Sequence, residues 1–248
     1  MKKIILFTVS IVCIILSFSA CSDIQGHDEY RYWCDYYKSA DFNKYKADNE
    51  KIGLPEEEAF RVVFMGNSIT EAWVTQRPDF FEGSAYVGRG ISGQTTLQML
   101  LRFREDVIDL EPKAVVILAG VNDIAGNWGF TTLELIVENI KSMVELARYH
   151  DIEVILCSVL PAIHFPWRPE LAPANDIIKL NGMIQKYAQE NKLIFVDYHT
   201  AMKDEKNGLK VPEYTSANDL VHPNVEGYKV MEKLVTPAIE QALNNLGE

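Results

Sequence analysis

Residues 62–73 read VVFMGNSITEAW. The apolar run Val62–Met65 predicts a buried strand, which stops at Gly66, and Ser68 follows two positions later. Glycine, asparagine and serine all favour turns, so the stretch can be a simple turn between a strand and a helix. It can equally hold a serine nucleophile on a tight strand-to-helix turn. A base and an oxyanion site elsewhere in the chain would decide between the two.

Four more short, apolar and β-rich segments follow, at 84–88, 114–120, 153–160 and 193–198. Helical patterns lie between them. The longest covers residues 131–150, whose apolar positions form one stripe: Leu133, Ile136, Ile140, Met143 and Ala147. Strands that alternate with helices predict an α/β fold, with a parallel sheet, right-handed crossovers and helices on both faces.

Composition narrows the class of protein. The chain has 248 residues, 48% hydrophobic and 24% charged, which suits one α/β domain with at most a small appendage. The net charge of -11 argues against a nucleic-acid partner. Nothing in the composition indicates an oligomeric state.

The first twenty residues differ from the rest. Lys2 and Lys3 precede an apolar run from Ile4 to Phe18, which is short for a membrane span and is typical of a secretory signal peptide. The ending FSAC resembles a bacterial lipobox, which implies a diacylglycerol anchor on Cys21 and an exported, lipid-anchored protein of the cell envelope. The alternative is ordinary cleavage nearby, with a free Cys21.

The following segment, residues 21–58, is interpreted as a tether and an aromatic helix ahead of a main domain at 59–248. Its block YRYWCDYYKSADFNKY (30–45) predicts a helix that packs its rings on the main domain, and a sugar-stacking surface is the alternative. Cys34 and Cys157 remain in the exported chain, and their spacing gives no reason to expect a bridge between them.

The strand exits carry the candidate chemistry, because ligands of parallel sheets bind beyond the carboxyl ends of the strands. Three exits open with glycine and continue with small polar residues, and the fourth is aromatic. They read GNS (66–68), GRGISG (88–93), GVND (120–123) and PAIHFPW (161–167).

A serine nucleophile needs a base, and His222 in NDLVHPN has Asp219 three residues upstream. This carboxylate can fix one ring nitrogen and leave the other for Ser68, although the same loop can simply cap a helix. The N–H groups of Ser68 and Gly90 and the amide of Asn122 can stabilise an oxyanion. The alternative for Asn122 is a side chain that only braces its own turn. The alternative for Gly90 is a glycine needed only because the backbone there has a positive φ.

Together the motifs GNSIT, RGISGQTT, GVND and DLVHPN resemble, in order and spacing, those of the SGNH hydrolases, the GDSL-type esterases and lipases. The resemblance runs from about Arg61 to the C-terminus. It implies a three-layer α/β/α sandwich with a flavodoxin-like parallel sheet of about five strands. It also implies a serine esterase that needs no metal or cofactor.

By the same resemblance, Ser68 is the nucleophile, His222 the base and Asp219 its orienting carboxylate, and Ser68, Gly90 and Asn122 form the oxyanion hole. Two positions depart from the family pattern. Asn67 replaces an aspartate that braces the turn, and Gly88 stands where the family often has asparagine.

The expected substrate is a short acyl ester, in particular an acetyl group on a carbohydrate met at the cell envelope. Aromatic rings near the exits suit sugar faces: Trp73, Trp128, Phe165 and Trp167. The substrate-binding candidates are Asn67, Trp73, His164 and Trp167.

Three alternatives stay open. The first is a lipid esterase resembling lysophospholipases or platelet-activating-factor acetylhydrolase. The second is a non-catalytic glycan-binding lipoprotein. The third is a metallohydrolase using His164, His199 and His222, although no metal-ligand spacing in the sequence supports it.

Overall fold

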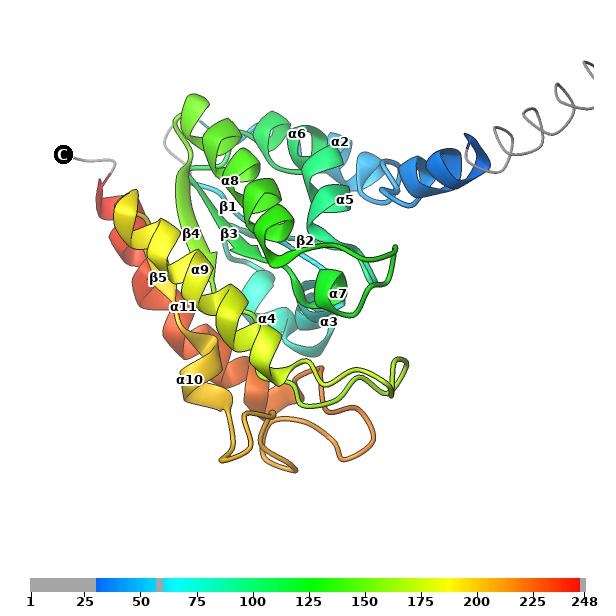
Figure 1. Cartoon of the computed structure of the whole chain (residues 1–248). Coiled ribbons are helices and arrows are strands. Elements are labelled where there is room, and N and C mark those ends of the chain that lie inside the picture. The colour runs from blue at the N-terminus through cyan, green and yellow to red at the C-terminus, as the bar shows by residue number, and fades with distance from the viewer. Residues whose placement is uncertain (1–29, 57–59, 246–248) are drawn as a thin grey trace, which may run out of the picture. The chain divides into compact units, whose positions relative to one another are not determined.

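A computed structural model describes residues 30–56 and 60–245 of the chain (Figure 1). Its centre is a five-stranded parallel sheet in the order β2-β1-β3-β4-β5. The strands are β1 (Val62–Gly66), β2 (Tyr86–Gly90), β3 (Ala114–Leu118), β4 (Glu153–Cys157) and β5 (Ile194–Val196). The prediction of a parallel α/β fold from the alternating pattern is confirmed.

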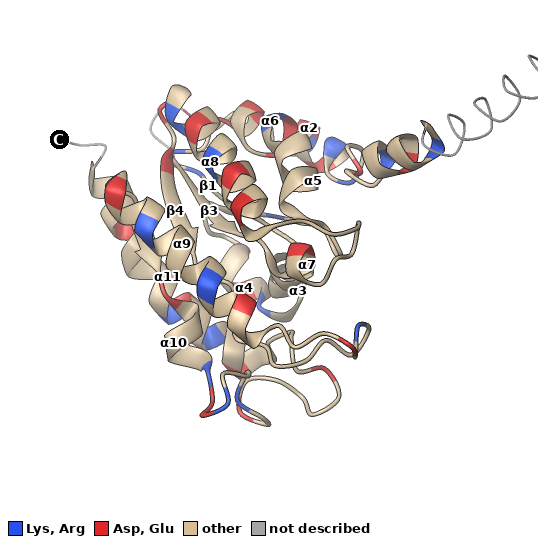
Figure 2. Ribbon diagram, viewed as in Figure 1, with Lys and Arg blue, Asp and Glu red and all other residues tan. Residues whose placement is uncertain are grey.

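Helices connect and cover the strands. They are α2 (Lys46–Ile52), α3 (Ser68–Gln76), α4 (Pro78–Phe81), α5 (Thr96–Leu101), α6 (Phe103–Asp106), α7 (Val121–Ile124), α8 (Leu133–Tyr149), α9 (Ala174–Glu190), α10 (Tyr198–Met202) and α11 (Val225–Asn245), with a 3-10 turn η1 (Ile108–Leu110). Charged side chains of both signs lie along the long helices α8, α9 and α11, whereas β1, β3 and β5 carry none (Figure 2).

The strand order determines where a ligand site can form. From β1 the chain moves outward to β2, and then returns past β1 to add β3, β4 and β5 on the other side. Right-handed crossovers therefore place α3 and α4 on one face and α5, α8 and α9 on the other. α11 returns to the first face, where Glu232 pairs with Arg77 of α3 at 2.8 Å. The direction reverses between β1 and β3, which is where open α/β sheets bind ligands.

The pairing register of the strands places the candidate segments at the same end of the sheet. Gly66, the last residue of β1, pairs with Gly90 at the end of β2 and with Leu118 at the end of β3. All five residues of β1 and of β3 are buried, so the middle of the sheet is rigid core. The segments that follow these strands are thus held at one edge of the sheet.

Trp73 was predicted to bind substrate beside a strand exit, and the structure shows that this is wrong. Its side chain is 1% exposed. The ring stacks on Phe80 and Tyr228, with centroid distances of 5.5 and 5.6 Å, and meets Phe64 edge-on at 5.5 Å. Trp73 therefore belongs to the aromatic core between the sheet and the helices α3 and α11. It cannot touch a substrate there.

The second strand also differs from its predicted range. It was expected at 84–88 and runs over Tyr86–Gly90. Ser84 belongs to the preceding turn, because its hydroxyl donates to the Phe81 carbonyl and accepts from the Tyr86 N–H. Gly90 is consequently the last residue of a strand rather than part of an exit loop.

The chain divides into two compact units, Met1–Asp41 and Phe42–Glu248, so the larger unit begins earlier than the expected residue 59. In the first unit residues 30–38 are helical, and Tyr30, Trp33 and Tyr37 are exposed. The predicted signal peptide and Cys21 lie outside the described residues. Within the part of the chain that the structure describes, no helix is long and apolar enough to cross a membrane. Cys34 and Cys157 are free thiols.

Candidate active site

Ser68 is the first residue of α3, directly beyond β1, and its side chain is half-buried. Asn67 caps this helix, because its Oδ1 accepts the Ile69 N–H at 3.0 Å. Gly66 is required before it, since a Cβ there would lie 2.0 Å from Thr70 Oγ1. Asn67 is 1% exposed. Its predicted contact with substrate is therefore wrong, and its side chain braces the turn.

His222 meets Ser68 across 154 residues of sequence. Its Nε2 lies 2.8 Å from Ser68 Oγ, and its Nδ1 lies 2.9 and 3.1 Å from the two carboxylate oxygens of Asp219. The Asp-x-x-His loop closes on itself, with Asp219 Oδ1 accepting the N–H groups of Val221 and His222. Leu220 has a φ of 66°, which provides the tight turn. The structure thus brings together the three residues predicted as a triad.

The electrostatics of Asp219 favour an ionised carboxylate. Burial raises the pKa of this group, but the hydrogen bond from the His222 backbone, the charge and ring of His222 and the Val221 N–H together hold the pKa below its ordinary value. A carboxylate in this position fixes the proton of His222 on Nδ1 and leaves Nε2 free to accept one. The arrangement can therefore draw a proton from the Ser68 hydroxyl.

Gly90 lies against the first turn of α3. A Cβ at this position would be 2.2 Å from the Glu71 backbone nitrogen and 2.6 Å from the Asn67 carbonyl oxygen, so only glycine fits. The Gly90 carbonyl accepts a hydrogen bond from the Tyr45 hydroxyl. The close approach to α3 places the backbone of Gly90 beside the segment that carries Ser68.

Asn122 follows β3 on the short helix α7 and is buried. Its Nδ2 donates to the Gln94 carbonyl at 3.0 Å, which joins the third exit to the second. Asp123, the next residue, accepts from the N–H and hydroxyl of Thr96. Burial raises the pKa of Asp123 to about 6, against the opposing effect of the Thr96 hydrogen bonds. These buried polar contacts hold the second and third exits together.

The fourth exit contributes one aromatic ring. Trp167 is 42% exposed, and its ring centroid lies 6.4 Å from that of His222. Phe165 is fully buried and stacks on the Trp167 ring at 5.2 Å, so the prediction that its ring could face a sugar is wrong. Trp128 is half-buried. His164 is half-buried on the same loop, and no hydrogen bond joins its ring to another described residue.

Sequence reasoning missed three polar residues of the site. Asn127 donates to the Gly93 carbonyl and accepts from Trp167 Nε1 at 3.1 Å, so it links the second and fourth exits. Gln94 and Arg102 bond to each other at 2.6 Å beneath the second exit. Of the three, only Arg102 could have been noticed in the sequence, because its charge between Leu101 and Phe103 interrupts an apolar helical run.

The metallohydrolase hypothesis requires a cluster of side chains that can hold a metal ion. In residues 30–56 and 60–245, no group of three or more histidine, cysteine or acidic side chains is arranged to hold a metal ion. His199, one of the three histidines of that hypothesis, is buried on α10, where burial lowers its pKa.

Replacing Asn67 with aspartate is expected to change kcat/KM by less than about tenfold, or roughly 1.4 kcal/mol. The carboxylate can still accept the Ile69 N–H, and it suits a helix N-terminus. Steady-state kinetics on a small aryl ester measure the change. Asn67→Ala is the matched variant, which removes the cap and should lower stability by about 1 kcal/mol. A large loss of activity in Asn67→Asp alone would show that the turn depends on the amide.

Known proteins that resemble this chain have the motifs' expected family and the same fold. The model of the GDSL-like lipase/acylhydrolase family matches residues 64–230. The solved structure of a GDSL-like lipase from Bacteroides thetaiotaomicron is 50% identical and superposes with a TM-score of 0.79, over 82% of this chain and 98% of the lipase.

Two curated relatives are more distant. An acetylxylan esterase of Xylanibacter ruminicola is 26% identical over 229 residues, which are 77% of this chain and 45% of the esterase. An uncharacterised lipoprotein of Bacillus subtilis, YqeF, is 38% identical over 77 residues, which are 30% of this chain and 32% of the lipoprotein. The chain thus matches less than half the length of either relative.

Proposed function

Because the chain belongs to the GDSL-like lipase/acylhydrolase family, we propose that it is a serine esterase whose triad is Ser68, His222 and Asp219. The observation that carries this proposal is the continuous contact from Ser68 Oγ through the His222 ring to the Asp219 carboxylate, at 2.8 and 2.9 Å. A nucleophile, a base and an orienting group in this order are what acyl transfer by serine requires.

In the proposed mechanism, Ser68 Oγ attacks the carbonyl carbon of the ester while His222 Nε2 accepts its proton. The imidazolium that forms is stabilised by Asp219. Collapse of the tetrahedral intermediate breaks the bond to the alcohol, which leaves with the proton from Nε2. Water then enters, gives a proton to His222 and attacks the acyl group, and release of the carboxylic acid restores the Ser68 hydroxyl.

The developing oxyanion is bound, in this proposal, by the backbone N–H of Ser68 and by the Asn122 amide. The predicted third donor, the Gly90 N–H, does not fit this role, because the next N–H, that of Ile91, faces β1 and donates to Gly66, which turns the Gly90 N–H toward the free edge of the sheet. Ser68 is the first residue of α3, so its N–H has no partner within the helix and adds the positive end of the helix dipole. The Asn122 Nδ2 carries two hydrogens, of which Gln94 uses one. The second is free to serve the oxyanion.

The alcohol side of the ester is proposed to be a carbohydrate. A cavity of about 720 Å³ is lined by Asp123, which follows Asn122 in sequence, and by Arg168, which follows Trp167, although no triad residue lines it. The lining combines the exposed Phe130 and the polar Thr131 and Asp176 with aliphatic side chains such as Leu133 and Leu171. Such a lining suits sugar rings, which have C–H faces edged by hydroxyls. The acetylxylan esterase relative supports an acetylated glycan.

The proposed location is the cell envelope, with a lipid on Cys21. The signal-like residues 1–20 and the FSAC ending support it, and so does the similarity to a B. subtilis lipoprotein.

The acyl group is tested with a series of esters of one alcohol. We expect kcat/KM to fall from acetate to butyrate to octanoate, because each methylene that a small acyl slot excludes costs about 1–3 kcal/mol. Ser68→Ala provides the background rate for every ester. Faster hydrolysis of the octanoate than of the acetate would replace the acetylesterase proposal with the lipid esterase alternative.

A further inference from the structure

Four buried polar side chains follow one another from the second exit through α5 and α6. They are Gln94, Gln98, Arg102 and Asp106, spaced four residues apart, and each is at most 3% exposed. Spacing of four is typical of one side of a helix, so we call this set the polar row. Burying polar groups is costly unless they are hydrogen-bonded, and the partners of the polar row therefore indicate what it holds in place.

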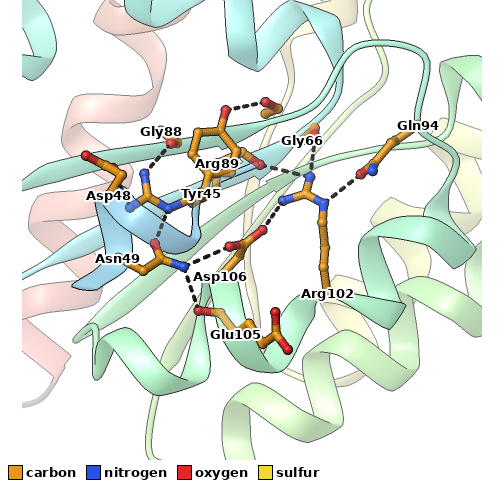
Figure 3. Close-up of polar contacts among 11 residues, drawn as sticks. Tyr45, Asp48, Asn49, Gly66, Gly88, Arg89, Gln94, Arg102, Glu105 and Asp106 are labelled. Carbon is orange, nitrogen blue, oxygen red and sulfur yellow. Dashed lines mark hydrogen bonds and ion pairs between the residues drawn. The ribbon is translucent and has the colours of Figure 1, made fainter. Parts of the chain in front are cut away.

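Arg102 anchors the side chain of Gln94. Its Nε donates to Gln94 Oε1 at 2.6 Å, and its Nη2 donates to the Gly66 carbonyl at 2.9 Å and to the Arg89 carbonyl at 3.0 Å (Figure 3). Asp106 pairs with Nη1 at 2.8 Å and balances the buried charge. Arg102 therefore ties Gln94 to the ends of β1 and β2.

Gln98 sets the direction of the backbone that follows Gln94. Its Oε1 accepts the Thr95 N–H at 2.8 Å and the Thr95 hydroxyl at 3.0 Å. In a trans peptide the N–H points opposite the preceding carbonyl, so the bond that holds the Thr95 N–H also directs the Gln94 carbonyl. That carbonyl accepts Asn122 Nδ2 at 3.0 Å. Gln98 and Asn122 thus bind opposite sides of one peptide unit.

The amide of Asn122 is oriented through this peptide unit. An amide NH2 group is planar and has two hydrogens, so the bond of one to the Gln94 carbonyl determines where the other points. The backbone beside Asn122 is held by the same helix, because the Asp123 carboxylate accepts the Thr96 N–H at 3.0 Å and the Thr96 hydroxyl at 2.6 Å. The start of α5 therefore holds both the side chain of Asn122 and its neighbour in sequence.

We propose that Gln98 and Arg102 are positioning residues that hold the Gln94 carbonyl and, through it, orient the Asn122 amide toward the oxyanion. This inference rests on the proposed esterase function. Both side chains are 0% exposed, so they cannot contact the substrate themselves. A donor that is fixed before the reaction needs no reorganisation when the oxyanion forms, which is the advantage that the polar row provides.

Gln98→Met tests the proposal in the full-length protein, because it removes the acceptor of the Thr95 N–H and keeps a side chain of similar length and helix propensity. Loss of one oxyanion donor typically lowers kcat by about 10²–10³, and a misdirected donor should lose part of that. We expect kcat on a small aryl acetate to fall about tenfold while KM changes by less than about twofold. The inhibition constant of a boronic acid, whose serine adduct is tetrahedral, should rise by the same factor as kcat/KM falls.

A double-mutant cycle with Asn122→Ala determines whether Gln98 acts through Asn122. Asn122→Ala alone should lower kcat by about 10²–10³, and adding Gln98→Met should then change kcat by less than about twofold. A further tenfold loss in this background would overturn the proposal, because a loosened fold does not act through Asn122.

Gln98→Glu is the conservative variant, and it keeps the test open if Gln98→Met does not fold. Glutamate at this position of a helix can still accept the N–H of Thr95, so kcat should stay within about threefold of the wild type. A loss of tenfold or more in folded Gln98→Glu would overturn the proposal, since the accepting oxygen is present.

Two control variants separate positioning from stability. Gln185→Met makes the same replacement at an exposed position of α9, and Ile184→Val trims the buried face of that helix. Both should keep wild-type kcat, even where Ile184→Val lowers the Tm. Wild-type kcat in Gln98→Met or in Asn122→Ala, with an active parent and an inactive Ser68→Ala, would overturn the positioning role and leave the triad standing. An inactive parent, or an active Ser68→Ala, would instead overturn the proposed function.

Discussion

Replacing Ser68 with alanine is expected to lower kcat for a small aryl acetate by about 10⁵-fold, the size typical of losing a triad nucleophile. Without Oγ no acyl-enzyme can form, and the remaining rate comes from binding and the oxyanion donors. Ser68 is half-buried, and its hydroxyl contacts His222. The fold should therefore survive, with a Tm within about 2 °C of the wild type.

The matched control is Ser142→Ala on the exposed side of α8, where the hydroxyl only donates to the Glu138 carbonyl. It should keep the full rate. The measurement is single-turnover and steady-state kinetics of purified proteins, together with thermal unfolding. If Ser68→Ala keeps even about a tenth of the rate, Ser68 is not the nucleophile.

Asp219→Asn is expected to lower kcat by about 10²–10⁴, strongly but less than the loss of Ser68. The amide oxygen can still accept the N–H groups of Val221 and His222, which hold it in place of Oδ1. The amide nitrogen then takes the place of Oδ2, 3.1 Å from His222 Nδ1, where it cannot accept a proton and brings no charge. The imidazolium formed during proton transfer loses its counter-ion.

Asp204→Asn is a matched control for this variant. Asp204 also accepts two backbone N–H groups in a turn, those of Lys206 and Gly208, but contacts no histidine ring. It should leave kcat unchanged. The two variants are compared by kcat and by Tm, and equal rates in Asp219→Asn and the wild type would remove Asp219 from the triad.

The fold was predictable because its strands are continuous apolar runs, and alternation with helices leaves few other topologies. Strand boundaries were less certain. The run at 84–88 was assigned to a strand that in fact begins at Tyr86, since Ser84 forms side-chain bonds within the turn. Local composition does not reveal whether a serine completes a turn or begins a strand.

Ser68, His222 and Asp219, which the structure brings together, could be picked out from short motifs and the family resemblance, whereas their surroundings could not. Trp73 lies five positions after Ser68, which is about 140° around a helix, so the periodicity itself pointed away from the site. Arg102 and Tyr45 form hydrogen bonds with partners 13 to 45 residues away, and such contacts depend on the tertiary structure.

The most direct test of Ser68 as the nucleophile is covalent labelling with a fluorophosphonate, which transfers its phosphonyl group to an activated serine and releases fluoride. Intact-mass and peptide mass spectrometry measure the number of labels and the labelled residue, in parallel with residual esterase activity. We expect one label per chain on Ser68, and loss of activity in proportion to labelling. Complete labelling of Ser68 with hydrolysis unchanged, or loss of activity through a label on another residue, would contradict the account.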